Sequence, residues 1–177
     1  MPDSSREDSF EAVVLPHLDA AYNLARWLTR DAAAAEDVVQ EAVLRALTYF
    51  SSFKGVNPRA WLLQIVRNVA YASKSLVRGA VMVALPGDGG GEAQMPELAD
   101  PGDDPETTLM RREDVRRVTR LLATLPADLR ETIVLREIEE LSYKEIAQIT
   151  ETPIGTVMSR LWRGRQLLAA AIKAKQG

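Results

Sequence analysis

Five side chains near the C-terminus are of types that can contact the edges of DNA bases. They are Thr156, Ser159, Trp162, Arg163 and Gln166. At about 100° per residue of a helix they share one side, and the opposite, core-facing side is expected to hold Ile154, Val157, Leu161, Gly164 and Leu168. From residue 152 onward the chain holds five Lys or Arg and no Asp or Glu. A helix in the major groove needs such groups toward the bases and cations toward the phosphates, so this pattern predicts a DNA-reading helix.

The segment just before this helix predicts a second, shorter helix and a tight turn. Ser142 followed by Glu145 forms a capping-box pattern, and Ile146, Ala147 and Ile149 then face inward. Residues 150–152 supply the turn, and Thr152 before Pro153 supplies an N-cap and a first-turn proline. Two helices around a tight turn indicate a helix-turn-helix. The alternative is a solvated amphipathic helix whose basic end complements the helix dipole.

Composition favours an all-α protein without redox or metal chemistry. The chain has 177 residues, is 46% hydrophobic and only 6% aromatic, and is rich in helix-forming residues. It lacks cysteine and has one histidine, His17, so neither a disulfide framework nor a thiol or imidazole metal site is expected. We therefore expect no cofactor. A net charge of −3 implies that any DNA contact comes from local patches.

The ends and hydrophobic runs of the chain indicate a cytoplasmic protein without membrane insertion. The first ten residues are polar and partly acidic, unlike a secretory signal. No segment reaches the roughly 20 apolar residues of a membrane span.

Charge divides the chain into three parts. Residues 79–107 hold seven acids and no base, with Gly89, Gly90, Gly91 and four prolines, so they predict a flexible acidic linker. It joins two small helical domains, residues 1–78 and 108–177. The linker is either a solvated tether or a segment that occupies a basic channel of a partner or masks the cationic helix of its own chain.

Two amphipathic helices are predicted in the first domain, over residues 10–28 and 32–50. On the second, Val38, Val39, Ala42, Val43 and Ala46 share one side. The opposite side carries Asp37, Gln40, Glu41 and Leu44. A stripe that mixes carboxylates, an amide and a leucine suits a basic partner helix, although a plain solvated surface fits it as well.

A third helix is predicted to begin at Asn57 and Pro58, a cap followed by a first-turn proline. Its buried side is expected to consist of Leu62, Ile65, Val66, Val69 and Ala72. Its other side carries Asn68, Tyr71, Lys74, Ser75 and Arg78, with Arg67 at the margin. Aromatic, amide and basic groups along one helix suit single-stranded nucleic acid. Tyr71 and Trp61 fit the core equally well, and Trp61 is assigned to it. The aromatic loop 49–56 either anchors itself to the core or presents rings to a ligand.

Three segments, in this order, resemble the extracytoplasmic-function sigma factors, the smallest class of bacterial RNA polymerase specificity subunits. They read AAEDVVQEAVLRAL, NPRAWLLQIVRNVA and LPADLRETIVLREIEELSYKEIAQITETPIGTVMSRLWRGRQLL, with the acidic linker between the second and the third. The resemblance covers nearly the whole chain. It implies that the first domain is sigma region two and that the second is sigma region four.

The resemblance implies two functional faces in region two. One binds the clamp helices of the polymerase largest subunit and falls on Asp37, Gln40, Glu41 and Arg45. The other recognises and melts the minus-ten element, where a base is drawn from the stack into a protein pocket. It falls on Phe53, Arg67, Asn68, Tyr71, Lys74 and Arg78.

In region four the resemblance implies recognition of the minus-thirty-five element as duplex DNA. Ser159, Trp162 and Arg163 stand at the family's reading positions. Lys144, Thr156, Arg160 and Arg165 would contact phosphates. The linker would thread past the active-site cleft. The sequence departs from the family's usual pattern in two places. Met158 stands where many members have a basic residue, and the stretch after the third helix is less basic than usual. Both differences indicate that the free protein binds DNA weakly.

The sequence thus predicts a dissociable specificity subunit that performs no covalent chemistry. Its expected partners are promoter DNA and core RNA polymerase, which it would contact at the clamp helices and the flap. The resemblance also implies a stress or envelope response and an anti-sigma factor that holds the protein inactive. A regulator that binds an operator by itself is the main alternative. A hydrolase is disfavoured, because the chain has no P-loop, catalytic triad or metal-ligand cluster.

Overall fold

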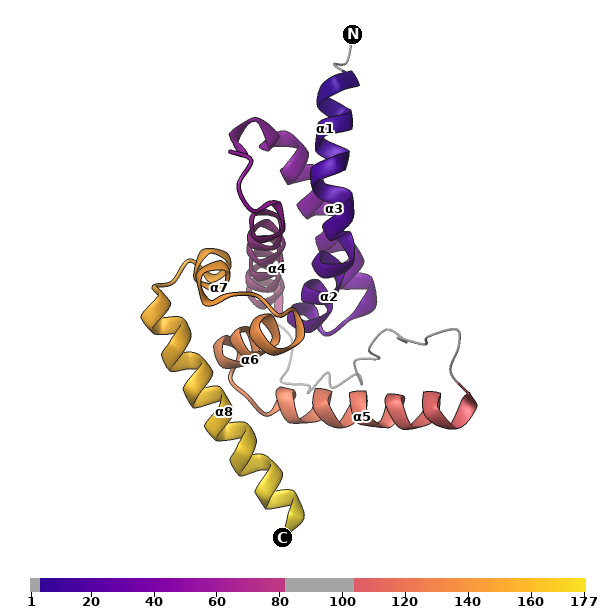
Figure 1. Cartoon of the computed structure of the whole chain (residues 1–177), viewed down its shortest axis with the longest axis vertical. Helices are drawn as coiled ribbons and strands as arrows, with labels where there is room; N and C mark the ends of the chain where they lie inside the picture. The colour runs from indigo at the N-terminus through magenta and orange to yellow at the C-terminus, as the bar shows by residue number, and fades with distance from the viewer. Residues whose placement is uncertain (1–3, 82–103) are drawn as a thin grey trace.

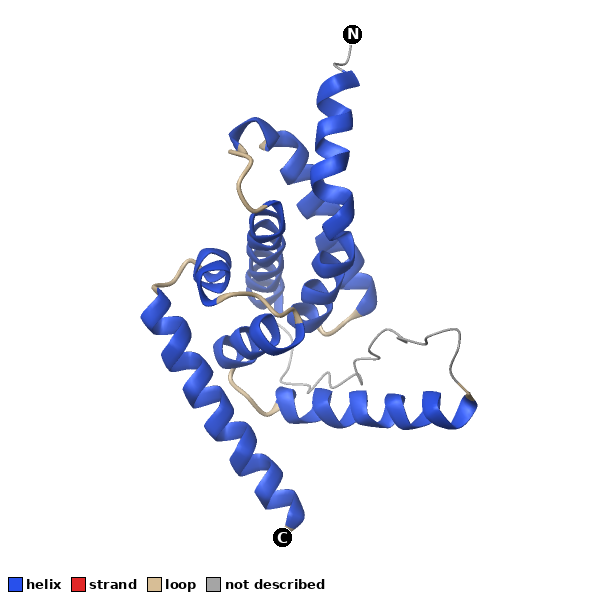
Figure 2. Cartoon of the chain, viewed as in Figure 1, coloured by secondary structure: helices blue, strands red, loops and turns tan. Residues whose placement is uncertain are grey.

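The computed structural model describes residues 4–81 and 104–177, and every regular element in these two ranges is a helix (Figures 1 and 2). The prediction of an all-α protein is confirmed. The predicted linker, residues 79–107, falls largely outside the described residues. None of the helices in the described part is both long and apolar enough to cross a bilayer.

The first half consists of α1 (Ser4–Val14), η1 (Leu15–His17), α2 (Leu18–Thr29), α3 (Ala32–Thr48), η2 (Phe50–Ser52) and α4 (Pro58–Val81). Helices α2, α3 and α4 pack against one another. Asp31 caps α3 by accepting a hydrogen bond from the Ala33 backbone N–H at 3.0 Å, and the Asn57 side chain caps α4 in the same way at 3.1 Å from Ala60 N. Val38, Ala42 and Ala46 are buried, as predicted.

Three sequence-based details in this half are wrong. The helix predicted over residues 10–28 is interrupted, because α1 ends at Val14 and a turn of 3-10 helix contains Pro16, which has no N–H to continue an α-helix. The second helix ends at Thr48, two residues early. On α4, Ala72 is exposed, while Leu63 and Ala70 are fully buried. The buried side of α4 differs because this helix packs on the second half of the chain as well.

The second half consists of α5 (Pro105–Ala123), α6 (Ala127–Ile133), η3 (Val134–Ile138), α7 (Tyr143–Thr150) and α8 (Ile154–Gln176). The capping box at the start of α7 is confirmed, since Ser142 and Glu145 each accept the other's backbone N–H. After α7 the chain turns through Glu151, whose φ is 54°. Pro153, not Thr152, is the N-cap of α8, and the Thr152 hydroxyl lies 2.8 Å from that of Thr150.

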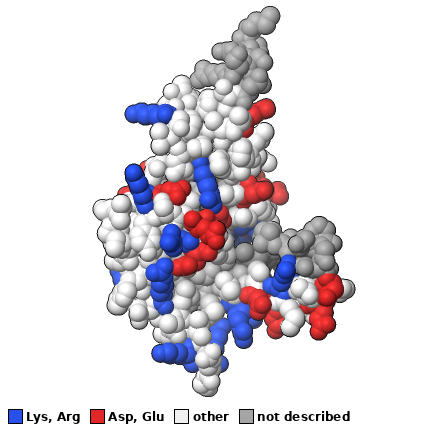
Figure 3. All heavy atoms as spheres, in the orientation of Figure 1, with Lys and Arg blue, Asp and Glu red and all other residues white. Residues whose placement is uncertain are grey.

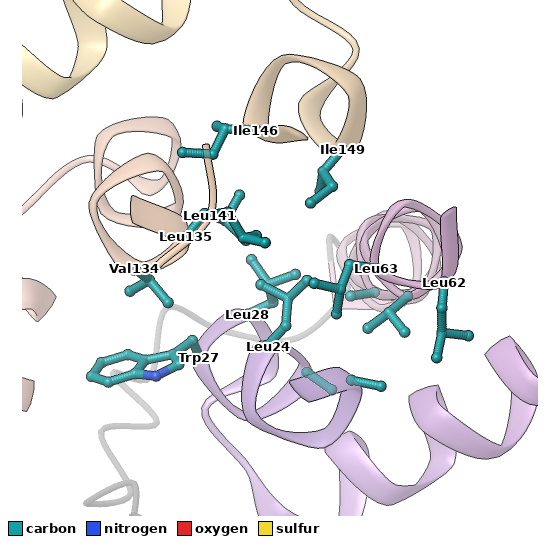
Figure 4. Packing of buried hydrophobic residues seen from close by; sticks show 14 of the residues in the cluster. Leu24, Trp27, Leu28, Leu62, Leu63, Val134, Leu135, Leu141, Ile146 and Ile149 are labelled. Carbon is teal, nitrogen blue, oxygen red and sulfur yellow. The ribbon is translucent and has the colours of Figure 1, made fainter. Parts of the chain in front are cut away.

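The two halves share one hydrophobic core. Figure 4 shows Leu28 of α2 and Leu63 of α4 facing Leu141 and Ile149 of the second half. These four side chains are at most 6% exposed. Helix α4 lies directly against α7, and α2 contacts η3. The described parts therefore pack as one body, in contrast to two independent bundles on a tether.

Helix α8 crosses α6 at a glycine. A Cβ atom added to Gly164 would lie 2.8 Å from Cγ1 of Ile133, closer than real Cβ contacts. Gly164 therefore lets α8 approach α6 closely.

We expect Gly164→Ala to lower the free energy of unfolding by roughly 0.5–2 kcal/mol. Overpacking a core costs about 1–3 kcal/mol, and the better helix propensity of alanine returns part of it. Gly155→Ala on the same helix is the matched control, because nothing lies within 4 Å of its added Cβ. Urea unfolding of both variants measures the difference. Equal stability of the two variants would show that the α6–α8 contact does not require glycine.

Candidate nucleic-acid interface

Helix α8 presents the predicted base-reading residues to solvent. Val157, Leu161 and Gly164 are buried and fix the rotation of the helix. Ser159, Trp162 and Arg163 are exposed on its outer side, and Trp162 is 64% exposed. An indole held in solvent beside a guanidinium contributes little to the core, whereas both groups are suited to contacts with base edges and phosphates.

Two of the four residues predicted to contact phosphates, Arg160 and Arg165, already pair with carboxylates of the same chain. The Arg165 Nη2 atom donates to Glu137 at 2.8 Å, and the Arg160 Nε atom lies 3.7 Å from a carboxylate oxygen of Asp128. The hydrogen bond that Arg165 donates to the Glu137 carboxylate raises the pKa of Arg165. Lys144 is exposed and Thr156 is half-buried. The Arg165–Glu137 pair is about half exposed on both sides, and exposed ion pairs contribute only about 0.2–1 kcal/mol, so a DNA phosphate can replace Glu137 at small cost.

The surface charge is arranged unevenly over the face seen in Figure 3. Lys and Arg occur along the left and lower margin, of which α8 forms the lower left part in Figure 1, and a few lie near the centre and at the right, where Asp and Glu gather. This arrangement allows local DNA contact despite the net charge of −3.

The polar face of α4 is engaged by the second half of the chain. Arg67 donates from Nε and Nη2 to the two carboxylate oxygens of Glu131, and the Tyr71 hydroxyl donates to the same carboxylate at 3.1 Å. The Arg67 guanidinium lies 4.5 Å from the centre of the Tyr71 ring. The Glu131 side chain is completely buried. Three groups that the sequence did not connect thus form one buried cluster between α4 and α6.

The pKa values in this cluster reflect its burial. Burial, reinforced by the charge of Glu131, raises the pKa of the Tyr71 hydroxyl to about 12. Burial alone would lower the pKa of Arg67, but the hydrogen bond and charge of Glu131 outweigh it and raise that pKa. Both side chains therefore keep their protons at neutral pH and act only as donors toward the carboxylate.

The other predicted minus-ten residues lie in different environments. Asn68 is exposed, and Lys74 is half-buried with Nζ 5.9 Å from the centre of the Tyr71 ring. The side chain of Arg78 lies outside the described residues. Phe53 packs its ring 4.9 Å from Trp61 and 6.1 Å from Phe50. Phe53 thus packs on Trp61, which packs on the core as expected, whereas Tyr49 of the same loop is 61% exposed.

The face predicted to bind polymerase is exposed along α3. Asp37, Gln40, Glu41 and Arg45 are all at the surface, and Arg45 Nε donates to Glu41 at 2.9 Å. Leu44, on the same face, is 59% exposed. An exposed leucine among charged groups is typical of a protein interface with a polar rim.

The sequence did not identify the carboxylates that meet α4. Glu139 accepts from Arg59 through both its backbone oxygen, at 2.7 Å, and its carboxylate, at 3.2 Å. The signal available was at Glu131, which lies three and four residues before the apolar Val134 and Leu135 and so shares their core-facing side of the helix. A glutamate in such a position requires a partner, because an unpaired buried charge is costly.

Family models match both halves of the chain. Residues 13–75 match sigma-70 region 2, and residues 116–168 match sigma-70, region 4. The RNA polymerase sigma-H factor of Pseudomonas aeruginosa is 32% identical over 93% of this chain and 86% of its own length. The ECF RNA polymerase sigma-E factor of Haemophilus influenzae is 35% identical over 85% of this chain and 79% of its own length.

Two solved structures resemble the whole molecule. One is the sigma factor RpoE from Bartonella quintana in complex with the anti-sigma factor NepR, with a TM-score of 0.74, 28% identity and coverage of 93% of this chain and 97% of that one. The other is CnrH in complex with the cytosolic domain of CnrY, with a TM-score of 0.65, 24% identity and coverage of 95% and 90%, which supports the fold alone.

The chain belongs to the extracytoplasmic-function sigma factors of the sigma-70 family. The members of this family are transcription initiation factors. They bind core RNA polymerase and direct it to promoter DNA, which confirms the predicted partners.

Proposed function

We propose that this sigma factor uses α3 to bind the clamp helices, α4 and the Phe53 loop to open the minus-ten element, and α8 to read the minus-thirty-five element. It acts in the cytoplasm and performs no covalent chemistry itself. Residues 1–78 form region two, residues 108–177 form region four, and residues 79–107 link them. The observation that carries this proposal is the exposed reading face of α8, in a chain that matches both sigma regions.

Support for the minus-thirty-five role comes from the way α8 is held. Buried Val157 and Leu161 orient the helix so that Ser159, Trp162 and Arg163 project together from one side. The capping box fixes the start of α7, and the Thr150–Thr152 hydroxyl contact lies at the turn after it. A rigid reading helix is the property that a helix-turn-helix requires.

The minus-ten role is supported by the types of side chain on α4, and the clamp role by the exposure of the acidic face of α3. Arginine, asparagine, tyrosine and lysine on α4 can bond to bases, stack with them and pair with phosphates. The face of α3 that carries Asp37, Gln40 and Glu41 is exposed, and its carboxylates suit a basic partner helix. Because both regions bind one assembly, modest individual contacts combine through effective concentration.

We also propose that an anti-sigma factor controls this protein, within a stress or envelope response. The support is the similarity in fold and sequence to the Bartonella quintana sigma factor, whose structure contains an anti-sigma factor. The partner of the present chain would be expected to contact both regions, since both are needed at the promoter.

Run-off transcription over a library of promoters tests the proposed function. Core RNA polymerase with the chain should yield transcripts from a set of promoters that share minus-thirty-five and minus-ten elements, and core polymerase alone should not. If the chain leaves the selection of transcripts unchanged, the proposed function is wrong.

A further inference from the structure

Four aromatic rings, which we call the aromatic cluster, join three separate segments of the first half. Phe10 lies on α1, Phe50 and Phe53 lie in the loop between α3 and α4, and Trp61 lies on α4. The ring centres of Phe10 and Phe50 are 5.4 Å apart and the ring planes meet at 85°, an edge-to-face contact. Phe50 and Phe53 are stacked, with ring planes at 18° to each other. The aromatic cluster is therefore a continuous path of ring contacts from α1 through the loop to α4.

Phe10 is the most deeply buried member of the aromatic cluster. It is 9% exposed, whereas the other three rings are half-buried. Val14, one turn further along the same side of α1, is 1% exposed and lies in the hydrophobic core. Figure 1 shows α1 beside the connection from α3 to α4. Burial of Val14 fixes α1 to the body of the first half, so that α1 holds Phe10 against the loop.

The loop that carries Phe53 contains only one short turn of regular structure, η2. In this turn the Phe53 N–H donates to the Phe50 oxygen at 3.0 Å, and the Ser52 hydroxyl donates to the Tyr49 oxygen at 2.6 Å. Residues 54–56, which follow, are exposed. A single 3-10 turn constrains a chain weakly. Packing of the rings on α1 and α4 therefore contributes most of what fixes the conformation of this loop.

We propose that Phe10 is a positioning residue for minus-ten recognition: through its contact with Phe50, it fixes the Phe53 loop in the conformation that meets the displaced base. This inference rests on the proposed function, because it assumes that the loop contacts the minus-ten strand. It extends the minus-ten site to α1, a helix that carries none of the residues assigned to DNA and lies mostly before residue 13, where the family match begins.

The physical reason is preorganisation. A loop that is held in one conformation before the DNA arrives loses less conformational entropy on binding, and it offers one shape against which bases are compared. Without the Phe10 ring the loop would sample several conformations and accept several bases. The reading residues on α8 and the polymerase-binding residues on α3 lie outside the aromatic cluster. Loss of the Phe10 ring should therefore weaken minus-ten discrimination selectively.

Phe10→Leu tests this role, because it keeps an apolar side chain and removes the ring. Run-off transcription with core polymerase and the full chain compares two series of promoters, one varied only in the minus-ten element and one only in the minus-thirty-five element. The ratio of transcript from the best to the worst minus-ten promoter should fall roughly two- to tenfold, the worth of one edge-to-face ring pair. The corresponding minus-thirty-five ratio should stay at the value of the parent chain.

Two further variants place the effect on the Phe10–Phe50 contact. Phe50→Leu removes the other ring of this contact and should lower the minus-ten ratio at least as much, because Phe50 also stacks on Phe53. The double variant should lose no more than Phe50→Leu alone, since Phe10 acts through Phe50. Phe10→Met replaces Phe10→Leu if the latter does not fold, because methionine fills irregular spaces in a core.

Val14→Ala is the matched control, since it truncates a buried side chain of the same helix outside the aromatic cluster. It should lower the melting temperature and leave both promoter ratios unchanged. An unchanged minus-ten ratio in Phe10→Leu, an equal fall of both ratios, or the same fall in Val14→Ala would overturn the positioning role and leave the proposed function intact. A parent chain that gives no promoter-dependent transcription in either series would contradict the proposed function instead.

Discussion

Replacing Leu63 with alanine should destabilise the whole chain by about 2–5 kcal/mol, the usual cost of truncating a fully buried leucine. Leu63 is 0% exposed and lies at the junction of the two halves (Figure 4). For a protein of this size each kcal/mol shifts the melting temperature by roughly 2–4 °C. Calorimetry should therefore show a single unfolding transition, with a melting temperature roughly 4–20 °C below that of the parent chain.

The single transition is the informative part of this result. Because the core runs from α2 and α4 into η3 and α7, loss of a contact at the junction should weaken both halves together. Leu109→Ala provides the control, since Leu109 on α5 is 64% exposed and its loss should change stability by at most about 0.5 kcal/mol. Two transitions, of which Leu63→Ala moves only one, would contradict a continuous core.

Replacing Arg163 with alanine should reduce discrimination among minus-thirty-five sequences by about 1–3 kcal/mol, the effect of losing a bidentate base contact. Arg163 is exposed on the reading face of α8, next to Trp162, and no carboxylate pair occupies it among the contacts described. Run-off transcription from promoters that differ only in this element measures the change. At 25 °C the expected loss corresponds to a factor of roughly 5–150.

Lys173→Ala is the control for charge alone. Lys173 lies in the last turn of the same helix, is exposed, and stands outside the reading face. Its removal should weaken transcription from all promoters by a similar, small factor, because a phosphate contact carries no sequence information. If Arg163→Ala lowers transcription from every promoter equally, Arg163 contacts phosphate and does not read a base.

Local features of the fold were predictable from sequence because they depend on neighbouring residues. The capping box at Ser142 and Glu145 and the cap at Asn57 were correct, as was the apolar side of α3. The error at Pro16 arose because the apolar period continues through it, although a proline removes the hydrogen bond that an α-helix needs.

Contacts between distant segments were not predictable. Arg67 and Tyr71 were assigned to DNA from their types, and their actual neighbour Glu131 is 60 or more residues away in the sequence. A helical pattern gives the side of α4 on which they lie, but not the element that covers it. Likewise, the pattern of loop 49–56 left its rings unassigned, and the structure packs Phe53 on Trp61 but leaves Tyr49 exposed.

Binding of the purified chain to core RNA polymerase and to promoter duplex, measured at equilibrium, distinguishes a polymerase subunit from an independent DNA-binding regulator most directly. We expect the chain to co-elute with core RNA polymerase as a stoichiometric complex, and to bind a promoter duplex tightly only within that complex. A chain that fails to co-elute with core polymerase, and binds the same duplex by itself with nanomolar affinity, would contradict this account.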